Sequence, residues 1–190
     1  MSSSFLDLLP LETSRLRIRQ YQSTDLEPTR AMSQDPELRK WIPTGVYSDK
    51  EHAEYVRVSG TADAKDFVVE DKMTDVVIGE MTFHPWFVEK TWEIGWLILP
   101  EFQGRGYASE AASALLDVGF SELEIHRIVA TAQPQNPASF RVMEKVGMRR
   151  EGEFLQCIPR SDGTWWDEVF YAILASEYKD MKIRQEIENP

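Results

Sequence analysis

The first third of the chain contains one alternating segment followed by several helix signals. Residues 15–21 alternate strictly between charged or polar and apolar side chains, which predicts a half-buried strand. Capping residues then favour a short helix over about 24–32 and a further short turn from Asp35-Pro36. A serine followed three residues later by a glutamate forms a capping box that opens a helix over about 48–59. This part is therefore predicted to be helical after its strand.

The middle of the chain changes to strand-like patterns. Three such runs cover residues 67–70, 76–87 and 91–99, and we expect them to form an antiparallel meander. Apolar and small residues then recur at helical spacing over 107–123, and residues 127–132 have the pattern of a strand. A strand, a helix and a strand in this order predict one parallel pairing.

The last third predicts one more helix and a hairpin. Asn136-Pro137 is a good helix start and Gly147 a good helix end. Strand-like runs over 149–158 and 165–174 flank the Asp162-Gly163 turn. The elements together predict an α+β fold, with a central, mostly antiparallel twisted sheet of about six to seven strands, one parallel pairing and flanking helices.

Composition limits the classes of binding partner and the cellular compartment that we expect for this chain. The 190 residues are 42% hydrophobic, which is enough for one sizeable core, and their net charge of −11 opposes binding to nucleic acid. The one cysteine, Cys157, cannot form an internal disulfide, and no Cys/His spacing indicates a metal site, so we expect a reducing cytoplasm. No apolar run approaches the roughly 20 residues that a membrane span needs. We therefore expect no membrane association.

The most informative stretch is the glycine-containing loop before the helix at 107–123. Gly104 and Gly106 allow positive φ angles and a close approach of the backbone to a ligand, and the helix N-terminus favours an anion. The loop lacks the P-loop pattern, and it has Ser109 where a dinucleotide loop needs a third glycine or alanine. A phosphate-bearing cofactor other than a dinucleotide is therefore predicted.

The run Gln103-Gly-Arg-Gly-Tyr-Ala108 resembles the signature of the GNAT acetyltransferases, whose loop binds the pyrophosphate of coenzyme A. The preceding strand, 92–101, and the segment 136–148 are also similar to that family. Leu11–Arg19 is similar to the start of the RimJ/RimL-type branch, which acetylates ribosomal-protein N-termini. The resemblance implies a GNAT domain over 11–178, with an N-terminal extension at 1–10 and a C-terminal tail at 179–190. The same branch also includes enzymes that act on antibiotics and small amines.

The resemblance further implies acetyl-CoA as cofactor, an amine-bearing acceptor and a set of site residues. Glu93 matches a position at which several GNAT enzymes carry a glutamate base. Ser139 matches a serine near the sulfur, whereas Met143 stands where the family often has a tyrosine acid. The expected cofactor-binding residues are Leu97, Ile98, Leu99, Gln103, Gly104, Arg105, Gly106, Tyr107, Ala108, Ser109, Asn136 and Ser139.

Four further residues are candidates for the acceptor site. Glu80 and His84 are reserve bases on the preceding strand, and they are equally suited to be cross-strand surface partners. Trp41 and Tyr47 lie in the early helical segment that covers the acceptor entrance in this fold, where aromatic faces would attract a cationic amine.

Three functions remain open at this point: an N-acetyltransferase that uses a protein N-terminus or a small-molecule amine, a module that only binds acyl-CoA, and a purely structural domain. The substitution of Met143 for the usual tyrosine favours the second, and the paired glycines disfavour the third. We expect a monomer or a homodimer.

Overall fold

The computed structural model describes residues 4–160 and 162–188, and its centre is one mixed sheet. The strands found in this part of the chain are β1 (Leu11–Glu12), β2 (Leu16–Arg19), β3 (Asp66–Asp71), β4 (Val76–Pro85), β5 (Thr91–Ile98), β6 (Arg127–Ala132), β7 (Arg149–Pro159) and β8 (Trp165–Leu174). Their order is β1-β2-β3-β4-β5-β6-β8-β7, and only β5 and β6 are parallel neighbours. The predicted mostly antiparallel α+β sheet with one parallel pairing is confirmed, with eight strands instead of six to seven.

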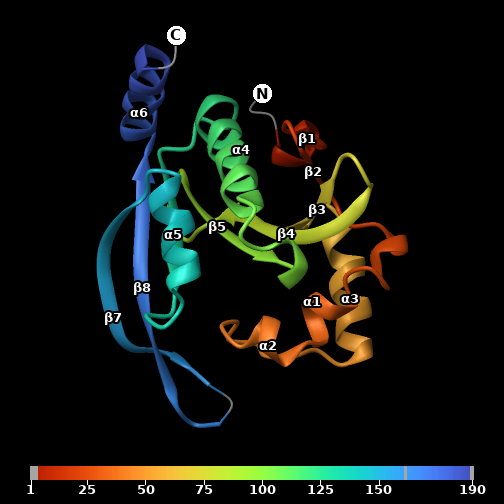
Figure 1. The fold of residues 1–190 in the computed structure, drawn as a ribbon. Coiled ribbons are helices and arrows are strands. Elements are labelled where there is room, and N and C mark those ends of the chain that lie inside the picture. The colour runs from red at the N-terminus through yellow and green to blue at the C-terminus, as the bar shows by residue number, and fades with distance from the viewer. Residues whose placement is uncertain (1–3, 161, 189–190) are drawn as a thin grey trace.

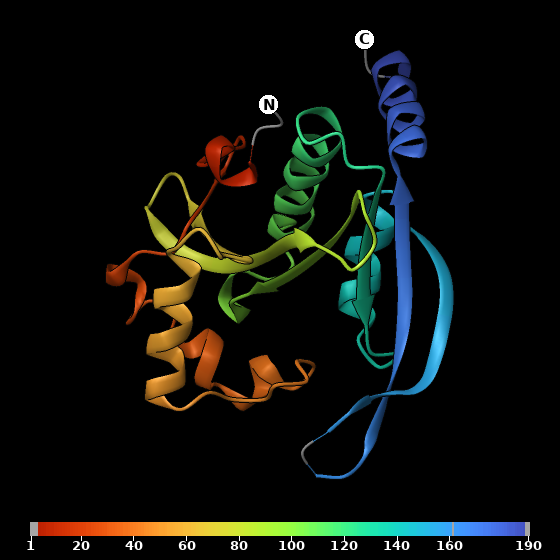
Figure 2. The ribbon, with the colours of Figure 1, turned by 180° about the vertical axis from the view of Figure 1, so that it is seen from behind.

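Helices cover both faces of this sheet (Figures 1 and 2). They are α1 (Arg30–Gln34), α2 (Pro36–Arg39), α3 (Asp49–Ser59), α4 (Tyr107–Ser121), α5 (Pro137–Lys145) and α6 (Ala175–Glu188). The helix α4 packs against β2, β4 and β5 on one face, and α1–α3 lie on the opposite face of these strands. None of the helices in the described part of the chain combines the length and apolarity that crossing a bilayer requires.

Each face of the sheet has its own apolar core. The larger core lies under α4, and Ile94 and Ile98 of β5 contribute to it. The smaller core lies under α1–α3, where Leu97 and Leu99 pack with Val56 of α3. Side chains of a strand alternate between the two faces, so β5 supplies both cores and fixes their relative position.

The strands β5 and β6 separate soon after they start. They pair only over three positions, from Thr91 opposite Arg127 to Glu93 opposite Val129. Beyond Glu93, β5 keeps its antiparallel partner β4 on one side and pairs with none of the described strands on the other. This leaves an open strand edge that begins at Glu93 and leads to the glycine loop.

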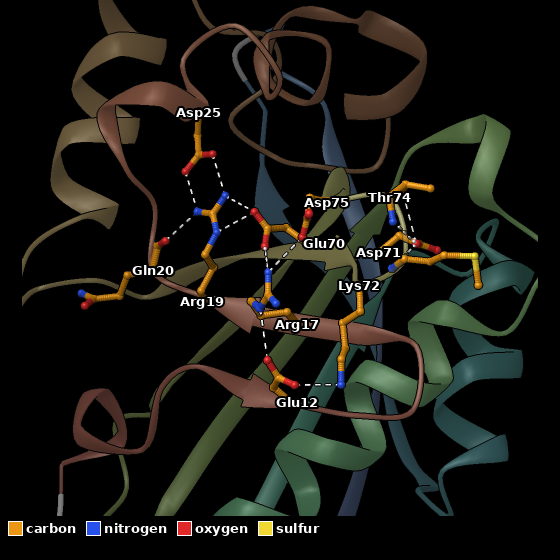
Figure 3. Close-up of polar contacts among 11 residues, drawn as sticks. Glu12, Arg17, Arg19, Gln20, Asp25, Glu70, Asp71, Lys72, Thr74 and Asp75 are labelled. Carbon is orange, nitrogen blue, oxygen red and sulfur yellow. Dashed lines mark hydrogen bonds and ion pairs between the residues drawn. The ribbon is translucent and has the colours of Figure 1, made fainter.

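An ion cluster ties β2 to its neighbours (Figure 3). Arg19 makes two hydrogen bonds to Asp25, at 2.7 and 2.8 Å, and a third to Glu70 at 2.7 Å. Arg17 pairs with Glu12 at 3.2 Å and with Glu70 at 3.3 Å. Because Asp25 and Glu70 are buried, the arginines supply the opposite charges that buried carboxylates need. The alternating pattern of the first strand thus places its arginines on one face and its apolar residues in the core.

Two segments differ from the sequence-based expectation. The predicted helix over 24–32 is wrong as one element: the chain forms a short 3-10 helix at Ser23–Asp25 and then α1. Pro28 explains the break, because it has no amide donor and disfavours helical geometry in the residue before it. At the other end, α6 occupies a region with no predicted helix, and the expected boundary at 178 lies inside it.

The N-terminal segment also joins the core. Phe5, in the 3-10 helix Phe5–Leu8, is only 4% exposed, and its ring lies 4.9 Å from both Phe67 and Phe83 in edge-to-face geometry. Aromatic pairs of this kind favour packing beyond the area that they bury. Within the expected extension at 1–10, the described residues 4–10 therefore contribute to the larger core, and residues 1–3 lie outside the described part.

Candidate active site

A cleft of about 1060 Å³ opens where β5 and β6 separate. Its walls come from β5, the glycine loop, the start of α5 and the α2 region. The predicted residues that line it are Trp41, Glu80, Leu97, Ile98, Gln103, Gly104, Gly106, Tyr107, Ala108, Ser109, Asn136 and Ser139. The predicted residues that do not line it are Tyr47, His84, Glu93, Leu99 and Arg105. The fold thus brings these segments, together with parts of β4, β6 and β8, to one cavity.

The glycine loop has the geometry of an anion site. Gly104 and Gly106 have φ angles of 73° and 81°, and Gly106 is the N-cap residue of α4. A Cβ atom on Gly104 would meet no protein atom within 4 Å, so the space in front of the loop is open. The side-chain Nε2 of Gln103 donates to the carbonyl of Ile98 at 2.8 Å and fixes the loop to the end of β5. The free N–H groups of the first helical turn favour a phosphate at this position.

Cationic side chains surround the same point. A Cβ atom on Gly106 would lie 3.7 Å from both Lys145 Nζ and Arg15 Nη2. Arg15 is held by Glu110 at 2.6 Å, whereas Lys145 has no ion pair among the described residues, and it lines the cleft with Arg141. Arg141 and Lys145 are four residues apart on α5, so they share one helix face. Neither residue was predicted from the sequence, although their spacing is visible there.

The open edge of β5 can bind an extended ligand through its backbone. The N–H of Leu99 donates to Ile78 of β4 at 2.9 Å, so it is not available to a ligand. Because backbone groups alternate along a strand, Leu97 also faces β4, and the N–H groups of Trp96 and Ile98 face the open edge. Within the predicted range 97–99, only Ile98 has the required orientation, and Trp96 was missed.

Asn136 and Ser139 meet at the start of α5. Asn136 Oδ1 accepts from the Ser139 amide at 3.4 Å, and its Nδ2 donates to Ser139 Oγ at 3.1 Å. Asn136 therefore caps the helix and also orients the serine hydroxyl on the cleft wall. Met143 is 1% exposed and belongs to the larger core. That position is turned away from the cleft and provides no proton donor.

Glu93 lies at the point where the two strands separate. Its Oε2 is 3.8 Å from Nε2 of His84 on β4. Burial raises the pKa of Glu93, and His84 and Lys65 oppose this shift. Burial also raises the pKa of Glu168 on β8, a cleft residue whose carboxylate is close enough to Glu93 for the two charges to repel. Glu168 was not predicted, because nothing in the sequence places β8 next to β6, the strand that separates from β5 at the cleft.

Glu80 is the most buried carboxylate of the cleft. Its Oε2 accepts hydrogen bonds from Tyr21 at 2.5 Å and from Tyr55 at 2.9 Å. Burial, together with repulsion from Asp66, raises the pKa of Glu80 to about 6. Tyr47 lies outside the cleft lining and packs on Tyr55 at 5.7 Å between ring centroids. Its contribution to the site is thus indirect.

The cleft suits acetyl-CoA in two respects. The α4 N-terminus with Lys145 and Arg141 fits a pyrophosphate, and the free edge of β5 fits an extended amide-containing arm. Carboxylates lie on other parts of the cleft wall, Glu80 on β4 opposite Leu97 and Glu168 on β8. The cleft thus combines a cationic region at the glycine loop with carboxylates elsewhere on its wall, which suits an anionic donor together with a cationic acceptor.

Comparisons with known proteins agree with this geometry. The model of the acetyltransferase (GNAT) domain matches residues 15–149. The uncharacterized N-acetyltransferase YnaD of Bacillus subtilis is 44% identical over 168 residues, which cover 88% of this chain and 98% of YnaD. The crystal structure of a GNAT-family acetyltransferase from Bacillus anthracis is 43% identical, with a TM-score of 0.82 over 87% of this chain and 98% of that chain.

A more distant relative has a named substrate. Spermidine N(1)-acetyltransferase of Vibrio cholerae is 28% identical over 112 residues, which cover 59% of this chain and 64% of that protein. The family match spans most of the chain, and the donor of this family is acetyl-CoA. The chain belongs to the GNAT family and is an acetyltransferase.

Proposed function

We propose that this enzyme transfers the acetyl group of acetyl-CoA to a primary amine, by direct attack in a ternary complex. The observation that carries the proposal is the open edge of β5, which runs from the glycine loop to Glu93. A donor fixed at the loop and extended along this edge would present its acetyl group to the carboxylates. The acceptor is a primary amine of a small molecule or a protein N-terminus, and Leu11–Arg19 favours the RimJ/RimL-type branch. We place the reaction in the cytoplasm.

The backbone of β5 would bind and polarise the donor. Acetyl-CoA supplies a thioester, which is an activated acetyl group. The N–H groups of Trp96 and Ile98 would donate to the extended arm and to the carbonyl oxygen that becomes negative during attack. Lys145 and Arg141 would hold the pyrophosphate together with the α4 N-terminus.

Glu93 is proposed as the base. Its raised pKa brings proton affinity closer to neutral pH, where a general base is most effective. It would take the proton from the acceptor ammonium directly or through one water. Ser139 Oγ, oriented by Asn136, would donate to the departing sulfur. A thiol has a pKa near 8.5, so its thiolate is already a fair leaving group and needs little assistance.

The function can be tested by thiol release from acetyl-CoA with a panel of primary amines and N-terminal peptides. The proposal expects release above the rate without acceptor for at least one amine, together with the N-acetylated product. Stabilisation of the protein against heat by acetyl-CoA, without release for any acceptor, would instead favour the binding module that the buried Met143 suggests.

A further inference from the structure

Glu80 has one carboxylate oxygen fixed by the protein and one left free. Both tyrosine hydroxyls, of Tyr21 and Tyr55, donate to Oε2. No hydrogen bond to Oε1 is found within the described part of the chain. Among the described residues, every side-chain nitrogen or oxygen that is fully buried has a hydrogen-bond partner. Since Oε1 has none, it is accessible to solvent, although Glu80 as a whole is only 7% exposed. Glu80 lines the cleft, so Oε1 is an acceptor that a ligand in the cleft can reach.

No residue in the described part of the chain forms an ion pair with Glu80. Arg39 is close enough to favour the charged form of Glu80, but its guanidinium donates to Gly45 O, to Met32 O at 3.3 Å and to Thr44 Oγ1 at 2.8 Å. The half-buried carboxylate nearby, Asp66, accepts from Thr82 Oγ1 at 2.6 Å and adds repulsion. Buried carboxylates without an opposite charge are costly, so a cation in the cleft would stabilise this arrangement.

The distance between Glu80 and Glu93 sets the length of a ligand that could interact with both carboxylates. Glu80 lies opposite Leu97, and Glu93 lies four residues earlier on β5, on the same face of the sheet. At about 3.3 Å per residue the two positions are roughly 13 Å apart. Gly95 lies between them and has no side chain, and it lines the cleft together with Thr82, which lies opposite it on β4. The floor between the two carboxylates therefore borders the cleft, where an unbranched chain could lie along it.

We propose that Glu80 is a specificity residue that binds a second ammonium group of the acceptor, and that the preferred acceptor is a linear diamine or polyamine with several methylenes between its nitrogens. The inference rests on the proposed function, because it assumes that the other nitrogen reacts near Glu93. The hydrogen bonds from Tyr21 and Tyr55 hold the carboxylate in place and leave Oε1 for the ligand. A monoamine of the same length would lack this contact.

The test compares cadaverine with pentylamine, which differ by one amino group. We expect wild-type kcat/KM to favour cadaverine by about tenfold or more, the range of one charge-assisted hydrogen bond. In Glu80→Gln the preference should fall to within about threefold of unity, mainly through the KM for cadaverine. The exposed Glu89→Gln, on the turn between β4 and β5, is the matched control and should keep the preference.

The preference should also depend on pH. The titratable groups that face Glu80 are Tyr21, Tyr55, Asp66 and Arg39. The pKa of Glu80 itself is raised to about 6 by burial and by repulsion from Asp66. The preference should therefore weaken as the pH falls through about 6, while both amino groups of cadaverine stay protonated. A preference that is unchanged at pH 5 would contradict the assignment to Glu80.

Calorimetry on the CoA-bound protein separates this inference from the proposed function. Tighter binding of cadaverine than of pentylamine, lost in Glu80→Gln, supports the inference even where no acceptor is acetylated. Equal binding and equal turnover of the two amines would overturn the inference and leave the enzyme function intact. An equal fall in kcat for both amines in Glu80→Gln would also overturn it, because Glu80 would then act on the reacting nitrogen.

Discussion

The substitution Gly106→Ala separates cofactor binding from folding. The new Cβ atom would lie 3.7 Å from Lys145 Nζ and Arg15 Nη2, which is ordinary van der Waals contact, so no clash is expected. The only cost to the fold is a non-glycine residue at a φ of 81°, about 1–2 kcal/mol. For a chain of this size such a loss lowers Tm by about 2–8 °C. The protein should therefore remain folded at room temperature.

The same methyl group would occupy the space between the cations and the first turn of α4, where the pyrophosphate is expected. Loss of one hydrogen bond to a charged group costs about 1.5–3 kcal/mol, which corresponds to a Kd about 10–100-fold higher. Calorimetric titration with CoA measures this change directly. The control is Gly163→Ala in the β7–β8 turn, which has the same φ of 81° and also no protein atom near its new Cβ. A Kd for Gly106→Ala within about threefold of wild type, or an equal rise in Gly163→Ala, would refute the position of the anion site.

Three further predictions concern the reaction and the fold. Glu93→Gln should lower kcat by about 10²–10⁴-fold with CoA affinity unchanged, and the deficit should shrink at high pH, where solvent deprotonates the amine; a pH series of kcat measures this, and a constant deficit would exclude the role of base. Ser139→Ala should lower kcat by about tenfold or less, since a thiolate leaves readily; the rate of thiol release at saturating substrate measures this, and a loss of several thousandfold would make Ser139 essential. Arg19→Met should lower the free energy of unfolding by about 3–5 kcal/mol, because Asp25 stays buried without its cationic partner and Glu70 keeps only Arg17; urea denaturation measures this, and a change below about 1 kcal/mol would contradict the importance of the ion cluster.

Local chain chemistry was enough to predict most of the elements. The capping box at Ser48 and Glu51 is formed as expected and opens α3. The strand β6 has the predicted bounds, and Asn136 caps α5. These features depend on residues a few positions apart, so they can be predicted from the sequence. The helix expected over 24–32 failed because the effect of Pro28 was not weighed.

Long-range neighbours could not be predicted in this way. Glu168 reaches the cleft because β8 follows β6 in the sheet, and this order is a property of the whole fold. The environment of Glu80 likewise depends on Tyr21 and Tyr55, which are 59 and 25 positions away in the chain. The direction of the Trp96 and Ile98 amides required the register of β4 and β5. Among the residues that line the cleft, the sequence therefore predicted those of the glycine loop more completely than those of β4, β6 and β8.

A single-turnover experiment tests the central claim most directly, namely that the acetyl group passes to an amine within this cleft. The protein is mixed in excess over acetyl-CoA with an amine that supports thiol release, and the products and the intact protein are analysed by mass spectrometry. The account predicts N-acetylated amine in amounts equal to the CoA released, with the mass of the protein unchanged. Release of CoA with an acetylated protein and no acetylated amine would contradict it.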